Sequence, residues 1–257
     1  MLTQKNISDL LEITKKLAAI EQWNEPRLPC DYLVIDIETL GFLHTDSEII
    51  QFGMCLVRDC KPVVDELWPG EYTSMIVKLP EEAFVGKEGA GKVHGIDYAK
   101  SQAEGLPKED VLLAVKDTLD YAISNGMQIV GHNLANFDIP FIIDIFQKHG
   151  IHYEFPKGTI VDTGMMVKAM QLGMMPGYDE RIWQWMKRVS GMRARGVYWS
   201  LDKFCMKEFG LEKHGASADA AHDAGYDCYL THLVVTEING MLDELEGVDK
   251  EMGEIPW

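Results

Sequence analysis

The stretch LVIDIETLGF, residues 33–42, ends an apolar run with two carboxylates. The preceding residues are aromatic, aliphatic and β-branched, which is typical of a buried strand. Side chains two positions apart on a strand point to the same face, so we expect Asp36 and Glu38 to lie side by side. Like charges repel, and their removal from water costs roughly several kcal/mol. A bound metal cation is the simplest counter-charge, so this stretch predicts a metal site.

The composition fits a globular protein with one large domain. The chain has 257 residues, of which 46% are hydrophobic and 25% are charged. No apolar run is long enough to span a bilayer, and the first residues lack the features of a secretory signal. Five cysteines form no C-x-x-C pair, which favours reduced thiols packed in the core. We therefore predict a cytoplasmic protein without membrane contact.

The net charge of −17 argues against a protein that coats nucleic acid, because neutralising phosphates requires Lys and Arg. It does not exclude an enzyme that holds a few nucleotides at one site. Part of the acidity lies in residues 241–257, which we interpret as a solvated acidic tail.

Hydrophobic spacing predicts an N-terminal helix followed by strands and then by alternating strands and helices. Helices are expected over residues 1–25, 108–124, 137–150, 164–172, 200–211 and 223–238. Strands are expected over residues 32–38, 48–59, 73–79, 127–133 and 159–163. This order implies an α/β fold, a mixed sheet with helices on both faces. The predicted organisation is a helical extension (1–27), a main domain (28–240) with a basic-aromatic insertion near 173–199, and the acidic tail (241–257).

The segment GKEGAGKV, residues 86–93, nearly matches the loop that binds nucleotide triphosphates. Val93 stands where that loop needs a hydroxyl to bind magnesium, and no buried strand precedes the segment. We interpret it as a flexible surface loop.

Other acids recur where they would reach the same edge of the sheet. Asp138 begins the helix that follows the strand ending in GHN, and sites in open α/β sheets form at the carboxyl ends of strands. Asp227 lies in the first turn of the last helix, and His222 in the preceding loop can turn toward the same place. Read alone, Asp138 would be a helix cap, and so would Asp223 beside a surface histidine.

Three segments in this order resemble the motifs of the DEDDh exonuclease family: DIET (36–39), HNLANFD (132–138) and HDAGYD (222–227). This family includes the epsilon-type proofreading exonucleases and RNase T. The segments KVHGID and VDTGMMVKAM resemble two further stretches of these proteins. The resemblance covers roughly residues 31–238. It implies an RNase H-like fold with a mixed five-stranded sheet, and hydrolysis of nucleic acid from the 3′ end.

The resemblance also assigns roles to the motif residues. It implies that Asp36, Glu38, Asp138 and Asp227 hold two divalent ions, Mg²⁺ or Mn²⁺, since hard oxygen ligands suit these ions. The ions would stabilise the attacking water and the leaving 3′ oxygen. His222 would be the general base, because histidine side chains titrate near neutral pH.

Residues that follow the first motif are expected to contact the substrate. In the family they meet the terminal nucleotide, which assigns that contact to Thr39, Leu40 and Phe42. The alternative is that Leu40 and Phe42 both belong to the hydrophobic core, and for Phe42 the two interpretations are equal.

Residues 181–199 form a local basic-aromatic segment, with five cations, four aromatic residues and no acid. These residue types suit stacking and phosphate contact with single strands, so we predict that Arg193 and Arg195 bind nucleic acid. The alternative is a helix with buried tryptophans and solvated cations.

We predict a metal-dependent 3′-5′ exonuclease that releases nucleoside monophosphates from single-stranded DNA by two-metal hydrolysis. The alternatives are a 3′-5′ exoribonuclease of the same family and a non-catalytic module that binds nucleic acid or protein. The segment DIETLGF lacks the DxEMTGL pattern of oligoribonucleases, which favours DNA. Without a polymerase domain in the chain, the enzyme would act alone or beside a polymerase or another protein partner.

Overall fold

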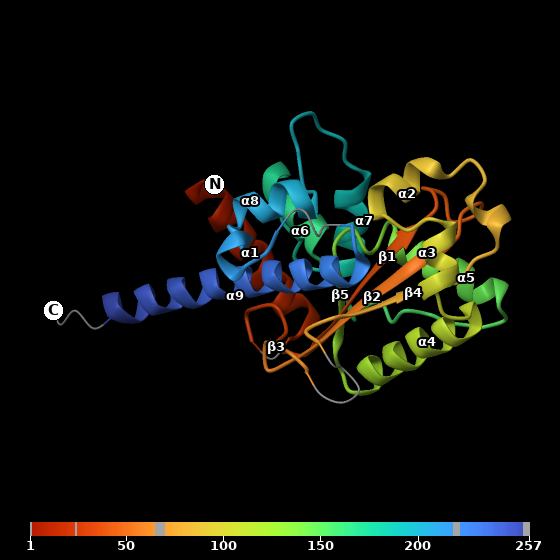
Figure 1. Cartoon of the computed structure of the whole chain (residues 1–257). Helices are drawn as coiled ribbons and strands as arrows, with labels where there is room; N and C mark the ends of the chain where they lie inside the picture. The colour runs from red at the N-terminus through yellow and green to blue at the C-terminus, as the bar shows by residue number, and fades with distance from the viewer. Residues whose placement is uncertain (1, 24, 65–69, 218–221, 254–257) are drawn as a thin grey trace.

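One mixed sheet forms the centre of the protein (Figure 1). The computed structural model describes residues 2–23, 25–64, 70–217 and 222–253, with side chains described through Glu244. The strands are β1 (Tyr32–Thr39), β2 (Ile49–Arg58), β3 (Lys61–Pro62), β4 (Thr73–Ile76), β5 (Gln128–Gly131) and β6 (Ile160–Asp162). Their order is β3-β2-β1-β5-β6, and β4 also pairs with β2.

The strand directions bring several strand ends to one edge of the sheet. β1 is antiparallel to β2, whereas β5 is parallel to β1 and β6 is parallel to β5. β3 and β4 pair with different parts of β2, on its side away from β1, so the six strands make a sheet five strands wide. The carboxyl ends of β1, β5 and β6 therefore lie together, as the predicted α/β fold requires.

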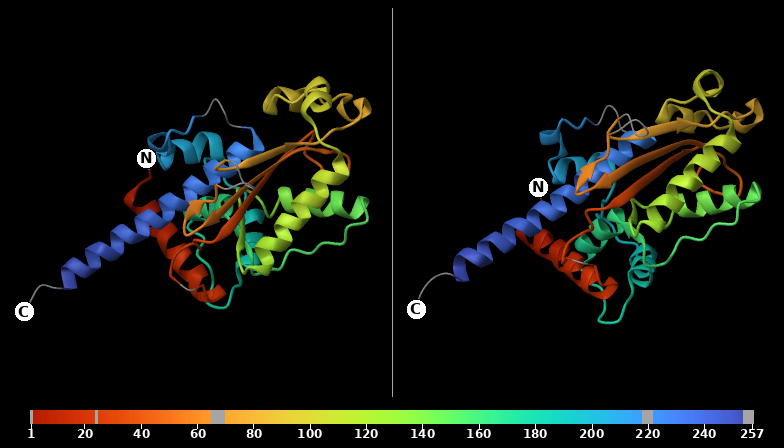
Figure 2. Two further views of the ribbon diagram at one scale, coloured as in Figure 1. Left: turned by 60° about the horizontal axis from the view of Figure 1, so that its bottom comes forward. Right: turned by 90° about the horizontal axis from the view of Figure 1, so that it is seen from below.

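Helices cover both faces of the sheet (Figure 2). Leu33 and Val34 point to opposite faces of β1, and both are fully buried. None of the helices within the described residues is long and apolar enough to cross a membrane. The longer helices are α1 (Gln4–Glu21), α4 (Lys108–Ser124), α5 (Asp138–Lys148), α6 (Thr163–Leu172), α7 (Ile182–Gly191) and α9 (Ala224–Gly253). The shorter ones are α2 (Glu88–His94), α3 (Tyr98–Glu104), α8 (Met206–Glu208), η1 (Glu81–Phe84), η2 (Leu201–Cys205) and η3 (Leu211–His214).

The N-terminal helix α1 packs onto the main body of the protein. Its buried face includes Leu10, Ile13 and Leu17, and it contacts α6, α7 and α9. The hydroxyl of Thr3 accepts a hydrogen bond from the backbone N–H of Asn6, which caps the first turn. The sequence spacing that predicted a helix here therefore reflects a real packing face.

Several features differ from the sequence-based expectation. The helix expected over 200–211 is divided into η2, α8 and the start of η3. Residues 88–93 of the expected surface loop lie in the helix α2, which ends at His94. Residues 241–253 of the expected acidic tail continue α9, while residues 254–257 lie outside the described residues. Cys30 and Cys60 form a disulfide, so the prediction of only reduced thiols was wrong. The pairing of β2 with β1 and β3 brings the two cysteines together, because Cys60 lies in the β2–β3 turn and its N–H donates to the Cys30 carbonyl.

Candidate active site

Strand β1 presents the first two acids on one face. It pairs with β2 from Tyr32 opposite Val57 to Glu38 opposite Gln51, and the register shifts just after Glu38. Burial first, and then repulsion from neighbouring carboxylates including Glu38, raises the pKa of Asp36 well above its usual range. Asp36 and Glu38 are therefore adjacent to each other, as predicted, and close to further carboxylates.

Asp138 reaches the same place from helix α5. It is the first residue of that helix, and its Oδ1 accepts a hydrogen bond of 3.1 Å from the backbone N–H of Ile37. This bond ties the α5 N-terminus to the middle of motif one. Asp138 is buried, and burial raises its pKa well above the usual value.

The third motif is held by a close approach between β2 and the start of α9. A Cβ atom at Gly53 would lie 2.0 Å from the carbonyl carbon of Ala224, so only glycine fits there. Asp223 caps the helix through an N–H···O bond of 3.0 Å from Tyr226 to its Oδ1. Its Oδ2 accepts a 2.7 Å bond from the Gln51 side chain. The capping alternative is thus correct for Asp223, and the cap fixes the position of Asp227.

His222 turns back toward the acids through an unusual backbone conformation. Its φ is +70°, in the left-handed region that few non-glycine residues adopt. Its N–H donates to Asp227 Oδ2 over 3.3 Å. One ligand atom each from Glu38, His222 and Asp227 lie within 4.8 Å of one another. The structure therefore brings together all five predicted motif residues.

The electrostatics of this cluster fit a divalent cation. Burial first, and then repulsion from Asp227 and Asp138, raises the pKa of Glu38 to about 8. Burial is also the main cause that raises the pKa of Asp227 to about 7. Asp227 Oδ1 is buried and has no hydrogen-bond partner among the residues that the structure describes. Carboxylate oxygens that repel one another, one of them unpaired, are a suitable donor set for a hard cation.

A cavity of about 780 Å³, which we call the Leu40 pocket, opens beside Glu38. Its lining includes the three residues predicted to meet a terminal nucleotide, namely Thr39, Leu40 and Phe42. Leu40 is part of the buried hydrophobic core, as the alternative had it, whereas Phe42 is 91% exposed, so a place in the core is excluded for Phe42. The structure therefore puts all three residues at one pocket next to the acids.

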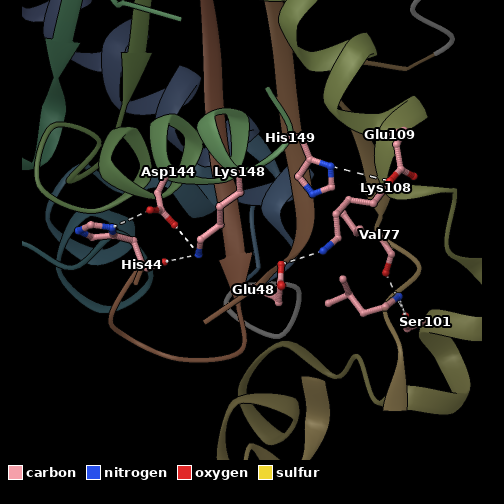
Figure 3. A network of polar contacts seen from close by, with 10 residues as sticks. His44, Glu48, Val77, Ser101, Lys108, Glu109, Asp144, Lys148 and His149 are labelled. Atoms are coloured by element: carbon pink, nitrogen blue, oxygen red, sulfur yellow. Dashed lines mark hydrogen bonds and ion pairs between the residues drawn. The ribbon is translucent and has the colours of Figure 1, made fainter. Parts of the chain in front are cut away.

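Ion pairs and hydrogen bonds brace the loop that forms this pocket (Figure 3). Glu48, at the end of the loop, lies 3.0 Å from Lys108 of α4. Lys148 of α5 pairs with Asp144 over 2.7 Å, and its Nζ also donates to the carbonyl of His44 over 3.4 Å. The loop between β1 and β2 is thus attached to two helices.

Two residues near the site were not identified from sequence. Asp202 Oδ2 lies 3.9 Å from His222 Nε2, and no local pattern around Asp202 indicated this. His94 is buried and lines the Leu40 pocket; its Nε2 has no hydrogen-bond partner within the described part of the chain. Burial first, and then the nearby His222, lowers the pKa of His94 to about 4. The resemblance of KVHGID to the family was the signal that could have identified it.

Arg193 and Arg195 lie outside the acid cluster. Both are exposed on the loop that follows α7. Arg193 lines a second cavity, together with Asn133 and Asn136 of the loop before Asp138, whereas Arg195 does not line it.

An acid cluster at the carboxyl ends of the parallel strands of such a sheet defines a class, the RNase H-like nucleases. The RNase T family model, described as "Exonuclease", matches residues 33–235. The protein belongs to this exonuclease family.

Similar proteins support the same assignment. The chain is 31% identical over 140 residues to a DNA polymerase III PolC-type from Caldanaerobacter subterraneus subsp. tengcongensis. It is 28% identical over 139 residues to another from Ureaplasma parvum. Each match covers 54% of this chain but only 9% and 8% of the relatives, so the chain spans a small part of their length.

Solved structures confirm the fold. A zinc-bound complex of E. coli exonuclease I with single-stranded DNA superposes with a TM-score of 0.59 at 18% identity, covering 85% of this chain and 43% of that one. A product-bound structure of exonuclease I gives a TM-score of 0.55 at 18% identity, covering 88% and 48%. The predicted RNase H-like fold is therefore confirmed.

Proposed function

We propose that this protein is a metal-dependent 3′-5′ exonuclease that removes nucleoside 5′-monophosphates from single-stranded DNA. The observation that carries the proposal is the convergence of Asp36, Glu38, Asp138, Asp227 and His222 from β1, α5 and the start of α9. Family membership supports nuclease activity, and similar structures titled as complexes with single-stranded DNA support the substrate class.

Four acids would hold the cations: Asp36, Glu38, Asp138 and Asp227. Two Mg²⁺ or Mn²⁺ ions, when bound, would neutralise charge on the attacking and leaving oxygens of an in-line displacement. The raised pKa values of Glu38 and Asp227 follow mainly from burial. Cation binding therefore releases protons that these carboxylates retain near neutral pH.

His222 Nε2 would take a proton from the attacking water. The water oxygen forms a bond to phosphorus as the bond to the 3′ oxygen breaks, and that oxygen leaves with a proton from solvent. Asp202 Oδ2 lies 3.9 Å from Nε2, so its carboxylate would face the ring after the proton transfer. The left-handed backbone at His222 fixes the direction from which the ring approaches.

The Leu40 pocket would receive the terminal nucleotide. Its lining is largely apolar and includes the exposed ring of Phe42, which can pack against a base. A polymerase partner is part of the proposal because the curated relatives are named DNA polymerases III. The cytoplasmic location stays a prediction.

The test uses two 5′-labelled single strands of identical sequence, one of DNA and one of RNA. Each is incubated with Mg²⁺, and with Mg²⁺ plus excess EDTA. We expect the DNA strand to shorten stepwise from its 3′ end with Mg²⁺ and to stay intact in EDTA. His222→Ala should lower the rate by at least about 10²-fold. His152→Ala, at an exposed loop position, serves as the matched control and should cleave normally.

Each other outcome selects an alternative. Faster cleavage of the RNA strand would assign the protein as an exoribonuclease. Two intact strands with both Mg²⁺ and Mn²⁺ would contradict the proposal and favour a non-catalytic binding module. Normal cleavage by His222→Ala would remove His222 from the mechanism.

A further inference from the structure

The basic-aromatic segment divides into two halves with different chemistry. In α7, Trp185 is fully buried, Arg188 pairs with Glu180 over 2.6 Å, and Arg181 pairs with Glu21 of α1 over 2.5 Å. This half matches the alternative of a helix with a buried tryptophan, since Arg181 and Arg188 are each paired with an acid, Lys187 is exposed, and Trp185 is in the core. The loop over residues 192–199 is different, and its cations need another explanation.

That loop closes over a cavity of about 400 Å³, which we call the cationic pocket. Its lining includes Arg193 and Trp199 of the loop and Lys168 of α6. Asn133 and Asn136, from the loop between β5 and α5, also line the cavity, and the Asn136 amide donates to Asn133 Oδ1 over 3.4 Å. The pocket therefore combines two cations, hydrogen-bonding amides and an indole ring.

Among the residues that the structure describes, no acid forms an ion pair with Lys168. The residue is buried, its Nζ donates to the carbonyl of Ser190 over 3.0 Å, and it lies 4.7 Å from the centre of the Trp199 ring. Burial first, and then repulsion from Arg193, lowers the pKa of Lys168. Two cations that repel one another beside a cavity are suited to an anionic ligand, because an anion removes the repulsion.

The pocket adjoins the acid cluster through two segments of the chain. Asn136 lines the cationic pocket, Phe137 lines the Leu40 pocket, and Asp138 follows directly. The Cα atoms of Asn136 and Asp138 are at most about 7.6 Å apart, because only two peptide units separate them. On the other side, the carbonyl of Trp199 bonds to the His132 ring, and three residues later Asp202 faces His222.

We propose that the cationic pocket holds a backbone phosphate of the nucleic acid on the 5′ side of the bond that is cut. This inference rests on the proposed function. It assigns the contact with the phosphate to Lys168 and Arg193 rather than to the whole basic-aromatic segment. The part of the strand on the 5′ side of the cleaved bond must extend away from the acid cluster. The cationic pocket adjoins that cluster and carries cations, so it is suited to the first phosphate of this part. Arg195, outside the cavity, contributes only through its long-range charge.

The test compares charge reversals in one segment of the chain. Binding of a 5′-fluorescein-labelled dT12 strand is measured by anisotropy in EDTA, from 50 to 300 mM salt. We expect Arg193→Glu to weaken binding by about ten-fold, and Arg195→Glu and the matched control Lys187→Glu by about two-fold or less. Arg193→Ala should reduce the slope of log K against log salt by about 0.7, the value for one phosphate of a single strand.

A second substrate separates this inference from the proposed function. The p-nitrophenyl ester of thymidine 5′-monophosphate has one phosphate and cannot reach from the acid cluster into the pocket. With Mg²⁺, the loss of kcat/KM caused by Arg193→Glu should be at least five-fold greater on the oligonucleotide than on the ester. Equal losses of affinity in Arg193→Glu and Lys187→Glu would overturn the pocket assignment alone. A wild-type protein that cleaves neither substrate would overturn the proposed function instead.

Discussion

The polar side chains at the two ends of β1 lie in opposite environments. At the amino end, the Tyr32 hydroxyl lies 2.8 Å from His232 Nδ1, and Asp31 Oδ1 accepts a 2.9 Å bond from the N–H of Asp59. At the carboxyl end, burial first, and then repulsion from further acids, raises the pKa values of Asp36 and Glu38. Paired polar groups stabilise a fold, whereas crowded like charges weaken it.

This difference separates structural from functional chemistry within one strand. The energetic cost at the carboxyl end persists because the surrounding elements hold the acids in place. The Asp138 bond to Ile37, the close approach at Gly53 and the Asp223 cap are three such restraints. Sites of this kind combine high reactivity with a local loss of stability.

The largest expected effect is that of Asp36→Asn. Loss of one ligand should lower kcat on single-stranded DNA by at least about 10³-fold, equivalent to about 4 kcal/mol of transition-state stabilisation. In EDTA at pH 8 the same variant should melt at the wild-type temperature or above it, because one buried acid is removed. Gel assays and thermal melts measure the two effects.

The control for this substitution lies at the other end of the strand. Asp31→Asn keeps an acceptor for the Asp59 N–H and should retain wild-type kcat. In the absence of metal, the melting temperature of Asp36→Asn could instead fall well below that of the wild type. That result would contradict the inference that crowded acids destabilise the carboxyl end of β1.

The next effect is a pH dependence of the metal-free protein. Burial is the main cause that raises the pKa values of Glu38 and Asp227 from their ordinary values of 4.5 and 3.8 to about 8 and about 7. The folded state therefore binds protons more tightly than the unfolded state. The contribution of these two groups to the stability of the folded state is greatest below about pH 4 and is lost as the pH rises toward 8. In EDTA we expect the melting temperature to fall by about 5 °C from pH 5 to pH 8, roughly 2 kcal/mol.

Mg²⁺ and a substitution provide the checks on that pH dependence. Saturating Mg²⁺ should raise the melting temperature at pH 8 more than at pH 5, since cations and protons compete for the same oxygens. Glu38→Gln should flatten the EDTA profile. A wild-type profile in EDTA that rises between pH 5 and pH 8 would show that other groups dominate.

The smallest expected effect comes from Tyr32→Phe at the paired end. It leaves the buried His232 Nδ1 without its hydroxyl partner, which should cost about 1–2 kcal/mol of unfolding free energy. Urea denaturation measures the loss, and kcat should stay within about two-fold of wild type. A larger effect on kcat than on stability would show that the two ends are not independent.

Local sequence patterns were sufficient for much of the fold. The helix expected over 108–124 is α4 (Lys108–Ser124), because Leu112, Val115 and Leu119 form its buried face and Pro107 precedes it. The motif residues at the carboxyl ends of β1 and β5 converge as expected, since parallel strands bring those ends together. Periodicity and topology therefore predicted the position of the site.

Features that depend on contacts between distant segments were not predictable. Cys30 and Cys60 are 30 residues apart in the sequence, and the pairing of β2 with β1 and β3 brings them together. Asp202 reaches His222 from the start of η2, which no spacing rule indicated. Lys168 did carry a local signal, as a single charge among the buried residues of α6, but its role needs the loop that covers it.

Helix α9 connects the site to a point well away from it. It runs for 30 residues from Ala224 to Gly253, and in Figure 1 its far end projects beyond the rest of the protein. At 1.5 Å per residue, position 250 lies about 35 Å along the axis from Asp227. The helix thus provides a labelling position at a known distance from the site. A fluorophore at position 250 would report the arrival of a dye-labelled strand by energy transfer without touching the reaction centre.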